Sequence, residues 1–419
     1  MLTIRRFCLF FLLPSIILFS SLILINEIEI FEMIELDSST GALCLDGSNY
    51  QFYLKRNQKS KNFIIFFDGG GWCSNKVYKN TLESCVKRTA TYLGSNNYFL
   101  NKVYSFFGKY PNFKRWMYFL SNDQTNNPDF HDYNKIILKY CDGRGFVGFN
   151  QDPIIYDGVS LYFRGFNNTI EVIKYAKTQL NLLEAENLII SGISAGGLAS
   201  LVYSNYFQEI LPKTIRVKTI SDSGVFFDFE HVNKSNNYSF SSVWKNLLID
   251  TKPEFPEGFL ESYCKFKQNE HWKCFLPEYF AGEIQVPVFF ILSLYDSYSI
   301  YTFVGDQCQL NASYFCFQKE VDLYKNKIKE FYEEFVETNE KWGGFFPGCF
   351  LHDYLSFSFD WENEKVKIDG LSLREAVGRW HLTGKTKVID LGNGIEENCS
   401  GYVGMFYYLA YSGILMDIF

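Results

Sequence analysis

The feature that most constrains the fold is a series of short apolar segments, each of which ends at a loop of small or acidic residues. The segments are rich in Ile, Val and Phe and cover residues 62–67, 135–140, 187–190, 215–220 and 286–294. The loops that follow them read DGGG, CDG, SGISAGG, SDSG and YDS. Short β-rich runs bounded by turn residues predict buried strands.

Predicted helices separate several of these strands. Residues 169–183 carry apolar side chains at helical spacing, and residues 198–207 follow the SGISAGG loop with good helix formers. Because parallel strands need crossover connections, the alternation predicts an α/β fold with a mostly parallel sheet and helices on both faces. The chain contains no internal repeat or low-complexity linker, so residues 37–419 are expected to form one domain. In such sheets ligands bind beyond the carboxyl ends of the strands.

The first thirty residues have the pattern of a targeting segment. Arg5 and Arg6 precede an apolar run at residues 7–25, in which Pro14 is embedded. A basic start followed by such a run predicts a secretory signal peptide at residues 1–30, and we favour its cleavage. A retained signal anchor is the alternative, because the run is nearly long enough to span a bilayer. No later run reaches that length, so the rest of the chain is expected to be secreted or lumenal.

Cysteine usage agrees with an exported chain. The sequence has 11 Cys, and Cys8 lies in the leader, so an even number remains for disulfides. A zinc site is disfavoured because the chain has no C-x-x-C pair and its five His are scattered, so we expect no metal. Five N-x-S/T sequons also fit an exported surface: Asn167, Asn233, Asn237, Asn311 and Asn398.

The charge distribution excludes one class of partner. The net charge of the 419-residue chain is −7, and the sequence contains no long basic run. A nucleic-acid-binding protein needs a basic stripe that neutralises phosphates. We therefore expect no nucleic-acid partner.

Residues 192–196, GISAG, match the G-x-S-x-G pattern. In this pattern a sharp turn between a strand and a helix presents the serine hydroxyl at the edge of the sheet, and crowding requires small residues on both sides. A predicted strand precedes the motif and a predicted helix follows it. We therefore predict that Ser194 is a nucleophile, and a plain strand–helix turn is the alternative.

A serine nucleophile needs a histidine base and an acid that orients the base. In α/β-hydrolases the chain order is serine, acid, histidine. Asp296 follows the strand predicted at residues 286–294, where the acid is expected. His352 and His381 come after it, and we prefer His352 because it lies in a loop, whereas His381 follows a predicted helix at residues 373–380. Three histidines precede Asp296 and are excluded by this order: His131, His231 and His271.

Ester hydrolysis also needs backbone N–H donors for the oxyanion. The residue after the nucleophile, Ala195, supplies one donor, and a glycine-rich loop after an earlier strand supplies another. Residues 68–72, DGGGW, occupy that place. A phosphate-binding loop would need G-x-x-x-x-G-K-[ST] or G-x-G-x-x-G spacing, which is not present here.

Together these motifs resemble the pectin acetylesterase and Notum family of α/β-hydrolases. The similar blocks include FFDGGGWCSN, RTATYLGSNNYF, NKIILKYCDGRGFVG, ISGISAGGLAS, DSGVFFD, CFLPEYF, FILSLYDSYSI, GCFLHDYL and LREAVGRW, in the family's order. They run from about residue 43 to residue 402, nearly the whole chain after the leader.

The resemblance implies roles for individual residues. Ser194 resembles the family nucleophile, Asp296 its acid and His352 its base, while Gly70, Gly71 and Ala195 resemble its oxyanion donors. It also implies three disulfide pairs: Cys73 with Cys85, Cys264 with Cys274, and Cys308 with Cys316.

Two departures lie close to these residues. Asp353 stands where plant-type members often have Cys, which leaves the partner of Cys349 open. Tyr298 replaces a plant-type Trp after the acid.

The substrate follows less directly from these motifs. GGGWC and CDGRGFVG are closer to the plant-type pattern, so we expect a secreted serine carboxylester hydrolase that removes acetyl from a polysaccharide such as pectin. The alternatives are Notum-like removal of a long acyl chain from a protein serine, acyl transfer to a sugar, and a catalytically silent glycan-binding protein. The mechanism requires no cofactor, and we expect a base of ordinary pKa, about 6.5.

Overall fold

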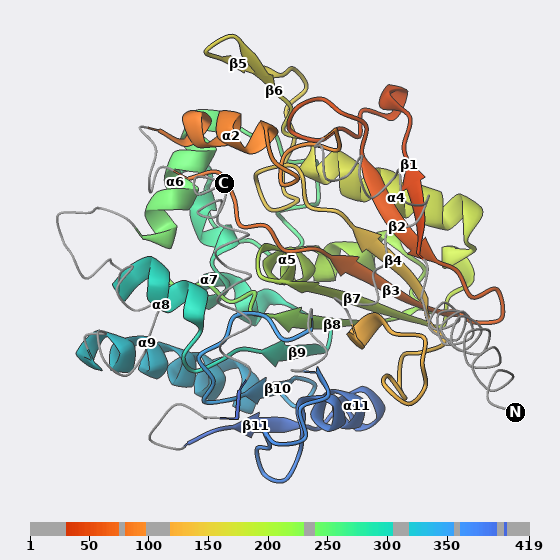
Figure 1. Cartoon of the computed structure of the whole chain (residues 1–419), viewed down its shortest axis with the longest axis vertical. Helices are drawn as coiled ribbons and strands as arrows, with labels where there is room; N and C mark the ends of the chain where they lie inside the picture. Colours follow the sequence, from red (N-terminus) through yellow and green to blue (C-terminus); the bar gives the residue numbers. More distant parts are fainter. Residues whose placement is uncertain are drawn as a thin grey trace, which may run out of the picture.

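The computed structural model describes residues 31–74, 80–97, 118–229, 239–304, 318–355, 361–391 and 398–399. Figure 1 shows the course of the chain. The leader predicted at residues 1–30 lies outside the described residues. Within those that are described, no helix is long and apolar enough to cross a membrane.

The core of the fold is a nine-stranded sheet in the order β1-β2-β4-β3-β7-β8-β9-β10-β11. Strand β2 pairs antiparallel with both its neighbours, and all other adjacent pairs are parallel. The strands are β1 (Glu32–Glu35), β2 (Gln51–Lys55), β3 (Asn62–Phe67), β4 (Asn134–Leu138), β7 (Asn187–Ile193), β8 (Arg216–Asp222), β9 (Val288–Ile291), β10 (Gly343–Phe346) and β11 (Lys387–Ile389).

Both faces of the sheet are buried, which explains the apolar run from Phe63 to Phe67 in β3. In β3, Phe63 and Ile65 belong to the core on one face, whereas Ile64 and Phe66 belong to the core on the other. Strand side chains alternate between faces, so a strand covered on both sides needs apolar residues at every position. The predicted α/β-hydrolase fold with helices on both faces is confirmed.

The two faces are covered differently. Helices α4 (Gly165–Gln179), α5 (Ala195–Ile210) and α6 (Phe240–Thr251) contribute Val172, Leu201 and Trp244 to the larger core. Helix α11 (Leu373–Thr383) contributes Ala376, Val377 and Trp380 to the smaller core, beside irregular segments. The other α-helices of the described residues are α2 (Thr81–Thr89), α7 (Pro277–Phe280), α8 (Ser297–Val304) and α9 (Gln318–Phe331).

A small hairpin stands apart from the sheet. Strands β5 (Ile154–Tyr156) and β6 (Val159–Leu161) pair antiparallel and project from the body at the top of Figure 1. Asp157 and Gly158 join them with φ of 48° and 75°, the left-handed conformation that two-residue hairpin turns require. The sequence analysis did not predict this hairpin.

Strand β10 was not predicted from the sequence, in which Gly343 and Gly344 precede the loop that carries His352. A Cβ atom on Gly343 would lie 2.5 Å from the Trp380 ring and 2.7 Å from the Phe289 ring. The glycine is therefore needed for close packing inside the sheet. Glycine in a strand can mark such a close approach as well as a turn.

Four disulfides connect described residues. Cys73 pairs with Cys85 and Cys264 pairs with Cys274, which are two of the pairs that the resemblance implies. Cys44–Cys141 was not predicted, and Cys349 pairs with Cys399. Cys308 and Cys316 lie outside the described residues. Cys44–Cys141 spans 97 residues and joins the segment before β2 to the end of β4. Loop-closure entropy predicts a stabilisation of about 4–5 kcal/mol for so long a loop.

Two of the five predicted sequons fall on described residues. Asn167 is half-buried in the first turn of α4, and Asn398 is exposed. Asn233, Asn237 and Asn311 lie outside the described residues. Exposure makes Asn398 the better placed of the two described sequons for modification.

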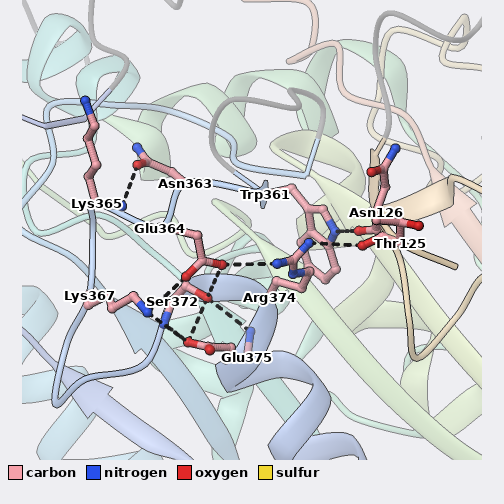
Figure 2. A network of polar contacts seen from close by, with 10 residues as sticks. All are labelled: Thr125, Asn126, Trp361, Asn363, Glu364, Lys365, Lys367, Ser372, Arg374 and Glu375. Carbon is pink, nitrogen blue, oxygen red and sulfur yellow. Dashed lines mark hydrogen bonds and ion pairs between the residues drawn. The ribbon is translucent and has the colours of Figure 1, made fainter. Parts of the chain in front are cut away.

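The segment before α11 is held by an exposed polar network, shown in Figure 2. Glu364 forms ion pairs with Lys367 at 2.9 Å and with Arg374 at 3.1 Å. Ser372 and Glu375 form a capping box at the start of the helix. The network therefore fixes where α11 begins.

Candidate active site

Ser194 lies on the sharp turn between β7 and α5. Its φ of 54° and ψ of −122° are rarely adopted by a residue other than glycine. The Ser194 N–H donates to the Asp222 carbonyl oxygen at 2.8 Å, which ties the turn to the next strand. Such backbone strain is typical of functional sites and of this motif in particular.

The small residues around Ser194 are required by close backbone contacts. A Cβ atom on Gly192 would lie 2.3 Å from the Gly196 carbonyl oxygen, and one on Gly196 would lie 2.1 Å from the Phe67 carbonyl oxygen. Gly197 is equally crowded, since a Cβ there would lie 2.4 Å from the Asp222 carbonyl oxygen. The G-x-S-x-G-G pattern is thus explained by backbone packing around one strained serine.

His352 and Asp296 meet Ser194 at the carboxyl edge of the sheet. His352 Nε2 lies 2.8 Å from Ser194 Oγ, and His352 Nδ1 lies 2.7 Å from Asp296 Oδ2. Asp296 follows β9 and its Oδ1 accepts the Ser299 N–H at 2.8 Å, so the first turn of α8 fixes the carboxylate. The three residues selected from the sequence therefore form one hydrogen-bonded chain.

The electrostatics of His352 differ from the sequence-based expectation of an ordinary pKa. Burial acts to lower its pKa, but the charges of Asp296, Asp353 and Asp222, together with the Asp296 hydrogen bond, outweigh burial and raise it to about 9. The sequence could not reveal that three carboxylates converge on one imidazole. This surrounding favours the imidazolium that a general base becomes after it accepts a proton.

His381 lies elsewhere, in the last turn of α11 and not after the helix as predicted. Its Nε2 lies 3.1 Å from the Tyr133 hydroxyl, and Lys218 donates to its backbone carbonyl oxygen. Burial, with the nearby charges of Lys218 and Arg216, lowers the pKa of His381 to about 4. Tyr133 precedes β4 and Lys218 lies near the start of β8, so His381 belongs to the opposite edge of the sheet.

The glycine-rich loop lies directly beside Ser194. A Cβ atom on Gly69 would lie 3.4 Å from the Ser194 Cβ atom, and Gly71 adopts a φ of 60°. Among the described residues, none accepts a hydrogen bond from the N–H groups of the three predicted donors, Gly70, Gly71 and Ala195. These N–H groups are thus left for a ligand beside the serine hydroxyl.

Two side chains that were not predicted from the sequence bond the backbone carbonyl groups of this loop. Arg88 of α2 donates to the Gly70 carbonyl oxygen at 2.8 Å and to the Trp72 carbonyl oxygen at 3.0 Å. The Tyr140 hydroxyl donates to the Gly71 carbonyl oxygen. Because the carbonyl groups of the loop are occupied, its peptide units are fixed in orientation. Arg88 lies in RTATYLGSNNYF, one of the blocks that resemble the family, but no role was predicted for it from the sequence.

Aromatic side chains fill the space next to the loop and the histidine. The Tyr298 ring lies 5.1 Å from the His352 ring, and Phe226 and Phe240 each lie 6.2 Å from Tyr298. Trp72 contacts Phe226 at 5.0 Å and Phe240 at 5.7 Å between ring centroids. We refer to Trp72, Phe226, Phe240 and Tyr298 as the aromatic cluster.

No metal site was predicted from the sequence. In the parts of the chain that the structure describes, no group of three or more His, Cys, Asp or Glu side chains is placed to hold a metal ion. The polar groups at the carboxyl edge of the sheet instead contact one another.

Comparisons with known proteins agree with this geometry. Residues 26–400 match the family model described as Pectinacetylesterase. Pectin acetylesterase 5 of Arabidopsis thaliana is 31% identical over 380 residues, which cover 86% of this chain and 82% of that protein. Pectin acetylesterase 4 of the same plant is 29% identical, with 86% and 85% covered.

A second group of relatives acts on a different ester. Palmitoleoyl-protein carboxylesterase notum2 of Xenopus laevis is 25% identical over 352 residues, which cover 82% of this chain and 65% of that protein. The relatives of both groups are named as esterases. The chain belongs to the pectinacetylesterase family and is a carboxylic ester hydrolase of the α/β-hydrolase fold.

Proposed function

We propose that this chain is a serine esterase in which Ser194 is the nucleophile, His352 the general base and Asp296 the orienting acid. The observation that carries the proposal is the hydrogen-bonded chain from the strained Ser194 through His352 to Asp296. A serine hydroxyl is a weak nucleophile at neutral pH and needs a base in this position.

The geometry suggests each proton transfer. His352 Nε2 accepts the Ser194 hydroxyl proton as Oγ attacks the ester carbonyl carbon. The tetrahedral intermediate collapses, its C–O bond to the alcohol breaks, and the imidazolium returns the proton to the leaving oxygen. Water then attacks the acyl-enzyme with His352 again as base, releasing the carboxylic acid and restoring Ser194. Asp296 keeps the Nδ1 proton in place throughout.

The N–H groups of Gly70, Gly71 and Ala195 are the proposed oxyanion donors. Each such donor contributes about 3 kcal/mol to transition-state stabilisation when it is held in position before reaction. Arg88 supplies that rigidity for the Gly71 N–H, because it holds the Gly70 carbonyl group of the same peptide unit. The bonds from Tyr140 and Arg88 to the Gly71 and Trp72 carbonyl groups fix the next two peptide units of the loop.

The acyl group that we propose is acetyl, carried by a polysaccharide such as pectin. The aromatic cluster supports a small acyl group, because its rings pack against one another beside Gly71 and His352, where a long chain would need space. The pectin acetylesterases compared are also more similar to this chain than the notum2 relative, at 31% and 29% against 25% identity.

We further propose that the protein acts outside the cytosol. Four disulfides among described residues fit an oxidising compartment, as does the targeting pattern at residues 1–30. Expression in a secretory host should release the chain into the medium with its leader removed, which N-terminal sequencing would detect. Retention in the membrane fraction with the leader intact would support the signal anchor instead.

The substrate proposal is tested by comparing acetylated pectin with a series of esters of increasing acyl length. We expect acetate release from pectin and a fall in kcat/KM as the acyl chain lengthens. Phe226→Ala, which removes one ring of the aromatic cluster, should shift the preference towards longer chains. Activity confined to long-chain esters would contradict the acetyl proposal and favour the Notum-like alternative, which the notum2 relative supports.

Two further measurements separate the remaining alternatives. An active-serine phosphonate probe should label the wild type but not Ser194→Ala, and an unlabelled wild type would favour a silent glycan-binding protein. Product analysis with and without a sugar acceptor distinguishes hydrolysis from acyl transfer, since both pass through the same acyl-enzyme.

A further inference from the structure

Asp222 is a fully buried carboxylate between the strands that carry Ser194 and Asp296. It ends β8 and is paired in register with Ile193 of β7 on one side and Ile291 of β9 on the other. Burying a carboxylate is costly unless hydrogen bonds compensate for the lost water. Its partners therefore indicate why this position holds an acid.

Besides its place in the sheet, Asp222 bonds two segments through its backbone carbonyl and its side chain, the Ser194 turn and the His352 loop. Its backbone carbonyl accepts the Ser194 N–H at 2.8 Å. Its Oδ2 accepts the N–H groups of Tyr354 at 2.6 Å and Leu355 at 2.7 Å, immediately beyond His352. Its Oδ1 accepts the Ser223 hydroxyl, which in turn accepts the Asp353 N–H at 2.9 Å.

The segments joined by these bonds are strained. Ser194, Ser223 and Asp353 have φ values of 54°, 50° and 62°, although none of them is glycine. Strain of this kind persists only where surrounding contacts enforce it. Asp222 and its neighbour Ser223 make the contacts that enforce it at this junction.

We propose that Asp222 is a positioning residue for the esterase reaction: it holds the His352 loop against the Ser194 turn and places a negative charge behind the imidazole. This inference rests on the proposed roles of Ser194 and His352. Asp222 and Asp296 thus divide the task, since Asp296 bonds the imidazole ring while Asp222 bonds the backbone that carries it. The other groups facing the ring are Asp353 and the Tyr298 ring.

Two substitutions separate the hold of Asp222 on the His352 loop from the effect of its negative charge. Asp222→Ala removes every side-chain acceptor, and a displacement of about 1 Å at a reacting group can lower kcat about 100-fold. We expect a loss in kcat of that size with little change in KM. Asp222→Asn keeps an amide oxygen for the Tyr354 and Leu355 N–H groups, so it should recover much of the kcat lost in the alanine variant.

The asparagine variant has a second readout that a purely structural role would not affect. The charge of Asp222 raises the pKa of His352. Its removal should move the acidic limb of the kcat/KM profile to lower pH, because the neutral amide no longer favours the charged imidazolium.

Asp142 offers a matched control. It is also buried, and its Oδ2 accepts the N–H groups of Arg144 at 3.2 Å and Phe146 at 3.0 Å, but it is not among the groups acting on His352. Asp142→Asn should leave the acidic limb in place, and circular dichroism checks the folding of each variant.

The outcomes that overturn the inference are distinct from those that overturn the proposed function. Wild-type kcat in a folded Asp222→Ala variant, or an acidic limb that Asp222→Asn does not shift, would refute the positioning role. If Asp222→Ala does not fold, the position of the acidic limb in the kcat/KM profile of Asp222→Asn tests the inference by itself. A wild type that the phosphonate probe does not label would instead refute the proposed role of Ser194.

Discussion

The molecule places carboxylates in two contrasting surroundings. At the carboxyl edge of the sheet, Asp222 and Asp296 are almost fully buried, and each of their oxygens faces a defined donor. At the start of α11, Glu364 and Glu375 are nearly half exposed, at 47% and 45%, and share Lys367 between them (Figure 2).

The contrast shows that the contribution of a carboxylate depends on how far it is exposed to water. In the exposed network, solvent screens the charges and several partners are interchangeable, so each pair contributes little. In the buried site no water replaces a lost partner, so a single atom change alters the chemistry. Variants made in both regions, with both activity and stability measured, therefore test the contrast directly.

The largest expected effect is that of Ser194→Ala. Loss of the nucleophile should lower kcat on an acetyl ester by about 10⁴-fold or more while the unfolding midpoint stays close to that of the wild type. Ser204→Ala is the control, because Ser204 is a buried serine of α5, the helix that follows Ser194, and its hydroxyl bonds Thr219 instead. Full esterase activity in Ser194→Ala would refute the nucleophile assignment.

Asp296→Asn should have the next largest effect. An amide nitrogen facing Nδ1 would favour the wrong imidazole tautomer, which lowers kcat by about 10⁴-fold in comparable triads. The matching change in the exposed region, Glu375→Gln, should leave kcat unchanged, since the network does not contact the site. If the two variants had equal activity, burial would not be the deciding difference.

The pH profile reports on the buried charges as a group. The carboxylates around His352 raise its pKa to about 9, and the imidazole must be neutral to accept the serine proton. The rate should therefore increase with pH, with kcat/KM rising about 50-fold between about pH 7 and pH 9. Rates of Ser194→Ala supply the background to subtract, and a plateau below pH 7 would contradict the raised pKa.

The smallest effects are expected at the start of α11. Ser372→Ala removes the N-cap of the helix and should lower the free energy of unfolding by about 1 kcal/mol with kcat unchanged. Lys367→Ala should give an unfolding curve that overlaps that of the wild type, because Arg374 still pairs with Glu364. Chemical denaturation measures both, and a large loss in the lysine variant would refute the interchangeability of the partners.

The central strands and the meeting of Ser194, His352 and Asp296 were predictable from the sequence because each depends on local pattern and chain order. Buried strands such as β3 are apolar throughout, and Ser194, Asp296 and His352 follow strands in the order that the α/β-hydrolase fold imposes. The leader at residues 1–30 and the single domain at residues 37–419 stay predictions.

The features that were missed depend on contacts between distant segments. Gly343 resembles a turn residue until Trp380 is packed against it, and Asp222 resembles any polar residue at a strand end until the His352 loop returns to it. Cys44–Cys141 spans 97 residues, and separation alone does not select a partner. The only available signal for Asp222 was its place in SDSG, directly after a predicted strand.

The disulfide between Cys44 and Cys141 has a consequence for the order of events during synthesis. Cys44 leaves the ribosome long before its partner and meets Cys73 and Cys85 first. Those two are only 12 residues apart, so they can close on each other as soon as both have emerged. By doing so they remove the earliest competitors for Cys44, which then waits for Cys141. Correct pairing is thus favoured by the order in which the cysteines leave the ribosome as well as by the final fold.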